Sequence, residues 1–335
     1  MVPKIFLTGA TGYIGGDVLY SLAKAHPEYE YTLLVRNEER GKPVAAAYPN
    51  ARLVYGSLDD ADILAKEAAA ADIVVHTANS ADDVPSARAI AQGLAAGHTA
   101  EKPGYWIHLC GTGILTWYDA SQRRFGQAPV PEQKYHDIDD IARIVSLPDV
   151  AIHRDVDKVV LAANDSPAVR TMIVGPPCIY GPGRGPVNKR SIQVPRITEF
   201  ALRNGYAPIQ APGLTEWDNV HIHDVSAFYV LAVEAALDPA KNGNPEIFGP
   251  KAYFFLESAM HRWSDVSRWI ADATAQQGLL PAPVTKEIDI PMLGTSSRCV
   301  AARARKYFGW EPKGSSLKDE IPAGVAVEAK RLGMA

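Results

Sequence analysis

Short apolar runs alternate with amphipathic segments over the first half of the chain, and the two patterns predict different elements. The runs are rich in β-branched residues and continuously apolar, as expected of strands that are buried on both faces of a sheet. They fall at 4–8, 31–36, 51–56, 72–78, 105–111 and 170–175. The segments between them, such as residues 15–26 and 86–101, space their apolar positions at helical intervals. Repeated strand, helix, strand units predict an α/β fold with a Rossmann doubly wound parallel sheet.

Beyond residue 181 the alternation weakens, and proline and glycine separate shorter elements. We expect a second, smaller α/β substrate-binding lobe in this part. The predicted division gives residues 1–181 and 222–250 to the dinucleotide-binding domain, and residues 182–221 and 251–335 to the lobe. A long polar insertion, residues 115–150, interrupts the first half. Insertions of this size are often functional, and a mobile surface excursion is the alternative.

Composition and charge exclude several classes of protein. Hydrophobic residues make up 47% of the 335, which supplies a substantial core. The net charge is −4 and no run of Lys or Arg occurs, so we expect no nucleic-acid partner. The three cysteines lie far apart and indicate neither a disulfide framework nor a metal site. The chain has no apolar run near the ~18 residues of a membrane span and no signal-peptide pattern, so we expect a cytoplasmic protein with no membrane partner.

The segment after the first strand carries the clearest chemistry. Glycines at 9, 12 and 15 lie between a predicted strand and a helix that opens within the glycine run. Gly9 permits the tight turn, Gly12 lets the backbone approach a pyrophosphate, and Gly15 lets the helix pack closely on the strand. The helix amides then meet the anion. A glycine-rich turn without a ligand is the alternative to the predicted dinucleotide site, which comprises Gly9, Thr11, Gly12, Tyr13, Ile14 and Gly15.

The residue at the end of the second strand indicates which nucleotide binds. Folds that prefer NAD usually carry Asp or Glu there, whereas this chain has Arg36. A guanidinium donates charge-assisted hydrogen bonds to the 2′-phosphate of NADP, and Arg40 is a candidate for a supporting contact. We therefore expect NADP(H) and favour NAD(H) less. Glu38 and Glu39 count against this preference, and a solvated strand end is the alternative interpretation of Arg36.

Further cofactor contacts are expected where the next two strands end. These positions are Ser57, Leu58 and Asp59 after the third strand, and Thr77, Ala78 and Asn79 after the fourth. Asp59 is placed to contact the adenine, and Ala78 and Asn79 lie beside the inner ribose.

Six motifs, in order and spread over nearly the whole chain, resemble those of the extended short-chain dehydrogenases/reductases of the epimerase/dehydratase type. They are TGATGYIGG, GSLDD, HTA, PPCIYGPG, WDNVHIHDVSAFYVLAVEAAL and FGWEPKGSSLKDEI. Within that family the chain is most similar to fungal epimerase-like proteins, whose activities are mostly unassigned. The resemblance implies a nicotinamide nucleotide cofactor. It also implies a homodimer in which the helix at 86–97 and the helix that starts near His153 pair across a two-fold axis.

The resemblance also implies an active site with one departure. In the family, a Ser or Thr after the fifth strand acts with a Tyr that stands four residues before a Lys on the next helix. The lysine holds the nicotinamide ribose and the tyrosine exchanges a proton with the substrate. Thr112 and Lys158 occupy the outer positions here, but Arg154 replaces the tyrosine. A guanidinium effectively never releases its proton, so Arg154 is limited to stabilising negative charge.

The proton must then come from another group. His153 is one candidate, and Tyr135 or Tyr118 on the insertion are others, although a helix cap and ordinary packing are the alternatives. The resemblance places Pro177, Cys178 and Ile179 beside the nicotinamide. It places a further set over the substrate: Arg184, Asn188, Lys189, Gln193, Trp217 and His221.

These features together predict an NADP(H)-dependent oxidoreductase that acts on a small carbonyl, enone or imine-type metabolite. One alternative is an epimerase, dehydratase or isomerase that retains its nucleotide. Another is a non-catalytic protein that senses NADP by binding it. The missing tyrosine favours the binding protein, whereas Thr112 and Lys158 favour the enzyme.

Overall fold

A seven-stranded parallel sheet forms the larger part of the computed structural model, which describes residues 2–334. The strand order is β11-β7-β5-β4-β1-β2-β3, and every pairing is parallel. The strands are β1 (Lys4–Thr8), β2 (Glu30–Val35), β3 (Arg52–Tyr55), β4 (Ile73–His76), β5 (Gly104–Leu109), β7 (Val169–Gly175) and β11 (Tyr253–Phe255). Every residue of β4 and β5 is buried, as expected of strands covered on both faces. The predicted Rossmann sheet is therefore confirmed.

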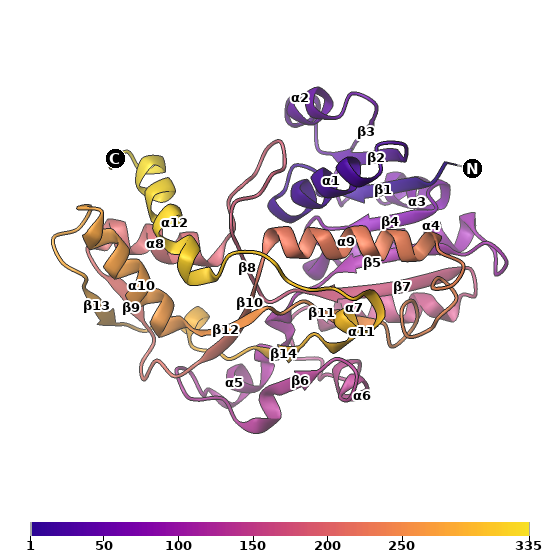
Figure 1. Cartoon of the computed structure of the whole chain (residues 1–335). Helices are drawn as coiled ribbons and strands as arrows, with labels where there is room; N and C mark the ends of the chain where they lie inside the picture. The colour runs from indigo at the N-terminus through magenta and orange to yellow at the C-terminus, as the bar shows by residue number, and fades with distance from the viewer. Residues whose placement is uncertain (1, 335) are drawn as a thin grey trace.

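Helices cover both faces of this sheet (Figure 1). On one face α1 (Tyr13–Ala25) packs against α9 (Ile222–Leu237), and on the other α4 (Val84–Gly97) lies between α3 (Ala61–Ala70) and α7 (Arg154–Ala162). Two further helices are α2 (Glu38–Ala47), which joins β2 to β3, and α11 (Ala302–Phe308), which packs against β11. From residue 2 to residue 334, no helix has both the length and the apolar character that crossing a bilayer requires.

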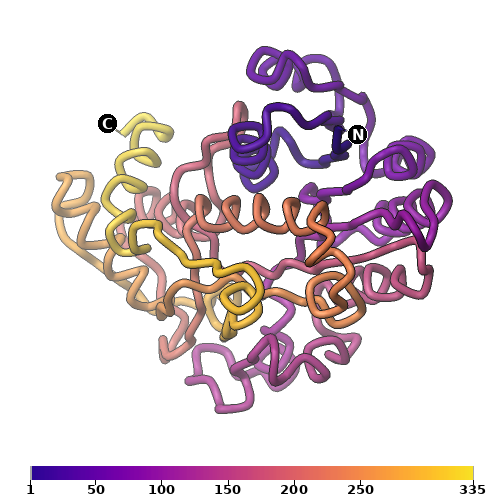
Figure 2. Tube along the Cα trace, turned by 45° about the vertical axis from the view of Figure 1, so that its right-hand side comes forward, coloured from indigo at the N-terminus to yellow at the C-terminus, as the bar shows by residue number. Residues whose placement is uncertain are grey.

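A second group of elements lies beside the carboxyl ends of the parallel strands (Figure 1). Its small sheet pairs β10 (Glu216–His221) with β8 (Cys178–Tyr180) and β12 (Ala259–Arg262), and a second pair joins β9 (Ala207–Ile209) to β13 (Thr285–Glu287). The helices are α8 (Gln193–Asn204), α10 (Trp263–Gln276) and α12 (Leu317–Arg331). A separate hydrophobic core, which includes Trp217, Trp263 and Ile270, lies among them. Figure 2 shows from a second direction that the C-terminal helix, in yellow, lies with this group.

Three short segments, β8, β11 and α11, lie with the other lobe from the predicted one. β11 was expected in the substrate lobe, but its buried aromatic run pairs with β7 at the edge of the main sheet. β8 was expected in the dinucleotide domain, but it pairs with β10 of the small sheet. Each strand has three residues, which is too short for a periodic pattern to assign it.

The polar insertion is folded against the C-terminal part of the chain. It contains α5 (Trp117–Gln122), β6 (Lys134–His136) and α6 (Ile141–Ile144), and β6 pairs with β14 (Arg298–Val300). Two fully buried carboxylates hold it there. Asp119 accepts a hydrogen bond from the Ser296 amide at 2.7 Å, and Asp137 accepts one from the Arg303 amide at 2.9 Å. The interpretation as a mobile excursion is therefore wrong for this segment.

The loop of residues 181–192, which we call the strap, crosses the first turn of α1. The Tyr13 hydroxyl donates a hydrogen bond to the Gly181 carbonyl at 2.7 Å. Arg184 enters between α1 and α9, where its Nη2 lies 2.6 Å from Asp17 Oδ1 and 2.8 Å from Ser226 Oγ. Asp17 is fully buried, so Arg184 is the cation that balances its charge.

Replacing Arg184 should therefore destabilise the protein strongly. Arg184→Ala leaves a buried carboxylate without a countercharge, which costs about 3–5 kcal/mol. Arg203→Ala is the control, because Arg203 pairs with Glu199 in an exposed i,i+4 arrangement worth less than about 0.5 kcal/mol. Urea denaturation measures both free energies of unfolding. Equal effects of the two substitutions would contradict the anchoring role of Arg184.

Candidate functional site

The turn between β1 and α1 has the backbone geometry that a nucleotide requires. Gly9 has a φ of 88°, and a Cβ on it would lie 2.7 Å from the Thr77 carbonyl oxygen. A Cβ on Gly15 would lie 2.5 Å from Thr77 Oγ1 and would also clash with the Gly9 carbonyl. Side chains are thus excluded at both positions, because β1, α1 and the loop after β4 approach one another closely.

The N-terminus of α1 is open to an anion. Its N-cap is Gly12, no side chain caps its amides, and no acidic residue stands in its first turn, as judged over residues 2–334. Thr11 and Ile14 are half-buried beside it. The Tyr13 side chain is buried against the strap, and burial raises the pKa of its hydroxyl well above its usual value. The free amides and the absence of negative charge suit the pyrophosphate of a dinucleotide.

The end of β2 presents a cation, unpaired within the described chain, at the position that distinguishes NADP from NAD. Arg36 directly follows β2, is exposed, and makes no ion pair with any other residue in the range 2–334. Asn37 caps α2 by accepting a hydrogen bond from the Arg40 amide at 3.0 Å. The carboxylates of Glu38 and Glu39 lie in the first turn of α2, where they complement its dipole.

The other predicted cofactor positions also lie at the carboxyl edge of the sheet. Ser57 donates its amide to Asp60 at 2.6 Å and shapes a turn in which Leu58 is half-buried and Asp59 is exposed. Thr77 donates its hydroxyl to the Thr8 carbonyl at 2.7 Å. Ala78 and Asn79 follow it directly, at the start of the loop toward α4.

The ends of β5 and β7 hold the predicted residues on the nicotinamide side. Thr112 is buried, and its Oγ1 lies 2.8 Å from Ser297 Oγ. Pro177 and Cys178 are buried and Ile179 is half-buried. Burial raises the pKa of the Cys178 thiol to about 12, so this group stays protonated and acts as an apolar residue.

Helix α7 turns His153 and Asp157 toward the ends of β4 and β5. His153 is the N-cap of α7, and its Nδ1 lies 2.6 Å from Asp82 Oδ1 in the turn after β4. Its Nε2 lies over Gly113, where a Cβ would be 3.1 Å away. One turn later, Asp157 is buried beside Cys110 and Tyr253, and burial raises the pKa of its carboxyl to about 6.

The opposite side of α7 carries the two cations that the family pattern selected. Arg154 donates hydrogen bonds from Nε to the Leu147 carbonyl at 2.9 Å and from Nη2 to the Val145 carbonyl at 2.7 Å. Lys158 is exposed and its Nζ lies 2.9 Å from Asp149 Oδ1. The structure therefore does not bring Arg154 and Lys158 to Thr112, which corrects the predicted placement of both residues. The physical reason is that neighbouring helix positions point about 100° apart.

The sequence does contain a pattern that indicates which face of α7 points inward. Positions 153, 156, 157 and 160 follow the i, i+3, i+4, i+7 spacing of one helix face, and Val156 and Val160 are fully buried. That stripe passes through His153 and Asp157. Asp82 and Gly113, which complete the arrangement, carry no signal of their own because their role depends on α7.

The candidate tyrosines of the insertion are packing residues. Tyr135 is buried, its hydroxyl accepts a hydrogen bond from Trp117 Nε1 at 3.1 Å, and the guanidinium of Arg143 lies 3.9 Å from its ring. Tyr118 packs edge-on against Trp117. Neither tyrosine is brought to His153.

Three of the residues expected over the substrate serve the fold instead. Arg184 anchors the strap, Trp217 Nε1 donates to the Thr295 carbonyl at 2.6 Å, and His221 is buried against Tyr180. Asn188 and Lys189 on the strap are exposed, and Gln193, the first residue of α8, is half-buried.

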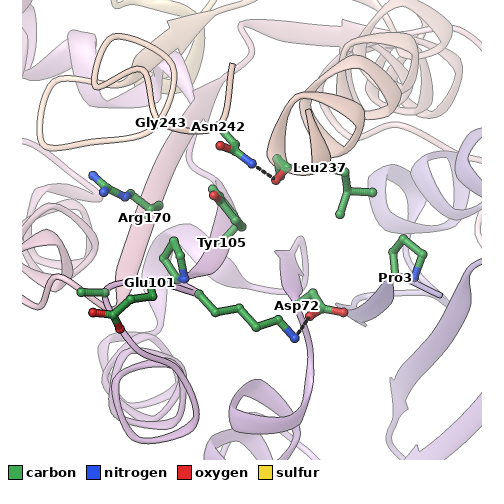
Figure 3. Close-up of a pocket in the computed structure, with 12 residues that line it drawn as sticks. Pro3, Asp72, Glu101, Tyr105, Arg170, Leu237, Asn242 and Gly243 are labelled. Atoms are coloured by element: carbon green, nitrogen blue, oxygen red, sulfur yellow. Dashed lines mark hydrogen bonds and ion pairs between the residues drawn. The ribbon is translucent and has the colours of Figure 1, made fainter. Parts of the chain in front are cut away.

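The cavity in Figure 3 lies at the amino ends of the parallel strands, away from the candidate site. It measures about 450 Å³ and is lined by Asp72, Tyr105 and Arg170, at the amino ends of β4, β5 and β7. An ion pair of 3.2 Å joins Lys102 to Asp72 across it. Nucleotides bind at the carboxyl ends of parallel strands, so this cavity is separate from the candidate site.

The comparisons with known proteins agree with this geometry. A family described as NAD(P)H-binding matches residues 9–102. The oxidase ucsJ of Acremonium sp is 34% identical over the full length of both chains. A dTDP-glucose 4,6-dehydratase from Streptomyces venezuelae, solved with NAD, is similar in fold, with a TM-score of 0.69 at 17% identity over 98% of each chain. The UDP-glucose 4-epimerase of Thermotoga maritima has a TM-score of 0.66 at 16% identity, over 98% of this chain and 99% of that one.

The matched NAD(P)H-binding segment contains the glycine turn, Arg36 and the loop after β4. The match with ucsJ extends the relationship over both lobes. The chain therefore belongs to the extended short-chain dehydrogenases/reductases of the epimerase/dehydratase type, and it carries a pyridine-nucleotide-binding domain.

Proposed function

We propose that the protein is an NADP(H)-dependent oxidoreductase that reduces a small carbonyl, enone or imine-type metabolite. The observation that carries the proposal is the position of His153, whose Nε2 lies over Gly113 directly after Thr112. The proximity of this ring to the segment after β5 supports His153 as the proton-transfer group, in place of the family's tyrosine. The name of the relative ucsJ, an oxidase, fits the same class of reaction.

The chain supplies binding and proton transfer, and bound NADPH would supply the hydride. The amides of the turn at Gly9 to Gly15 would hold the pyrophosphate, and Arg36 the 2′-phosphate. His153, protonated, gives the proton at Nε2 to the substrate oxygen or nitrogen and recovers it from solvent. Arg154 supports the loop of residues 145–149 by binding its carbonyls, since Nε and Nη2 are already engaged there.

The experiment that tests the proposal is NADPH oxidation with a panel of carbonyl, enone and imine substrates. His153→Gln should lower kcat about 100-fold or more, as expected for loss of a positioned acid, and should leave the Kd for NADPH unchanged within about twofold. Lys158→Ala should keep its activity because Lys158 is held outward by Asp149. Binding of NADPH without turnover of any substrate would favour the sensing protein. Loss of activity in Lys158→Ala, with activity kept in His153→Gln, would contradict the role of His153 and support Lys158 as the site residue, as in the family.

The nucleotide preference follows from Arg36. One charge-assisted phosphate contact contributes about 1.5–3 kcal/mol, so NADPH should bind more than tenfold tighter than NADH. Arg36→Ala should remove this preference and leave NADH binding intact. Lys42→Ala, which removes an exposed cation from the adjoining helix α2, is the control. Calorimetric titration gives all these affinities, and equal affinity of the unmodified protein for both nucleotides would refute the assignment.

The orientation of α7 predicts a pH dependence of stability through Asp157. The pKa of this carboxyl is about 6 in the folded protein and about 3.9 in the unfolded chain, so folding takes up protons between these values. Asp157 therefore lowers stability as the pH rises through about 4 to 6, and the full loss persists above that range. Asp157→Asn should raise the free energy of unfolding by about 2–3 kcal/mol at pH 8 and change it little near pH 4.

Asp155→Asn is the matched control on the same helix. Asp155 is exposed, so its replacement should change stability by less than about 1 kcal/mol. Urea denaturation across the pH range measures both variants. A difference for Asp157→Asn that does not depend on pH would mean that Asp157 faces solvent and that α7 is turned the other way.

A further inference from the structure

We propose that Asp82 is a positioning residue that prepares His153 for proton transfer. The inference rests on the proposed function, because it concerns the same site. Asp82 lies in the turn of residues 80–82 between β4 and α4, a different element from the one that carries His153. No motif that predicted the site includes Asp82.

The geometry of His153 shows that it is held in place. Its φ of 68° lies in the left-handed region, which is uncommon for a residue with a side chain, although histidine occurs there more often than most. The contact of 2.6 Å between Nδ1 and Asp82 Oδ1 then fixes the ring on one side. Gly113 makes room on the other side, since a Cβ there would lie 3.1 Å from Nε2.

This contact determines which ring nitrogen carries the hydrogen. A carboxylate only accepts hydrogen bonds, so Nδ1 must be the donor to Asp82. In the neutral ring the hydrogen is therefore on Nδ1, and the lone pair is on Nε2. In the protonated ring both nitrogens carry hydrogen, and Nε2 has no partner for it among residues 2–334. Nε2 is thus the atom that gives up and regains a proton.

The reaction step balances with these groups. The N–H bond at Nε2 breaks and an O–H bond forms on the carbonyl oxygen, and a bound reduced nicotinamide nucleotide would supply the two electrons and the second hydrogen as hydride. The product is an alcohol, and His153 is left neutral with its Nδ1 hydrogen still on Asp82. Asp82 keeps its charge throughout and stabilises the protonated ring before transfer.

Other charged groups around the ring have different roles. Asp157 and Arg154 lie on the same helix, but Asp157 is buried beside Cys110 and Arg154 is tied to the carbonyls of residues 145 and 147. His108 faces the ring from β5, and burial lowers the pKa of His108 well below its usual value, so it is neutral. Asp82 is the one carboxylate in the described chain that contacts the imidazole.

The first test measures the tautomer of His153 in the free protein by long-range ¹H–¹⁵N NMR correlation at alkaline pH, where histidine is neutral. His153→Gln assigns the signal. The unmodified protein should show hydrogen on Nδ1, and Asp82→Ala should shift the population toward hydrogen on Nε2. Asp82→Glu should restore the first pattern at least in part. Glu234→Ala, which removes the carboxylate from the exposed pair of His26 and Glu234 at 2.9 Å, should leave the signal unchanged.

The second test compares kinetics with the same variants. Asp82→Ala should lower kcat roughly tenfold or more and leave KM nearly unchanged, since a positioned acid contributes about 10²–10⁴-fold. Its thermal midpoint should stay close to that of the unmodified protein because the Asp82 side chain is 55% exposed. Hydrogen on Nε2 in the unmodified protein, or full kcat in Asp82→Ala, would overturn the proposal. Absence of turnover in the unmodified protein would count against the proposed function alone, because the tautomer is measured without substrate or nucleotide.

Discussion

Helix α7 packs one face against α4, β7 and the turn of residues 80–82, and this constraint decides which of its residues reach the candidate site. Val156 and Val160 are fully buried, so the rotation of the helix about its axis is fixed. His153 and Asp157 share that side, while Arg154 and Lys158 bind groups of the preceding loop on the other. A shift of one residue along the helix would rotate it by about 100°, which would bring Arg154 and Lys158 to the inward face and turn His153 and Asp157 away from it.

The glycine turn and His153 are connected through the close approach of β1 and β4. The φ of Gly9 and the absence of its side chain let the Thr77 carbonyl approach within the space that a Cβ would fill. The loop that follows Thr77 runs on to Asp82, which contacts His153. The phosphate turn, the loop after β4 and the N-terminus of α7 therefore form one continuous edge. The strap crosses the start of this edge and is fixed there by Arg184 and Asp17.

The sequence predicts the main sheet well because its strands are continuously apolar. The six predicted runs match β1 to β5 and β7 within about two residues at most ends, and the glycine spacing locates the phosphate turn. The buried partners of the insertion could not be predicted in the same way. Asp119 and Asp137 resemble solvated residues, yet they accept hydrogen bonds from amides of Ser296 and Arg303, far along the chain. Only the fold brings such partners together.

The expected approach of Arg154 and Lys158 to Thr112 is not seen, for a different reason. The family pattern was located on α7 from one lysine and its spacing from residue 154. The stripe of residues 153, 156, 157 and 160 instead indicates which side of α7 faces inward. A crystal structure of the complex with NADPH tests this orientation most directly. Our account predicts that the nicotinamide lies on the side of His153, with Lys158 Nζ still bound to Asp149. Lys158 Nζ within hydrogen-bond distance of the nicotinamide ribose, with His153 turned to solvent, would contradict it.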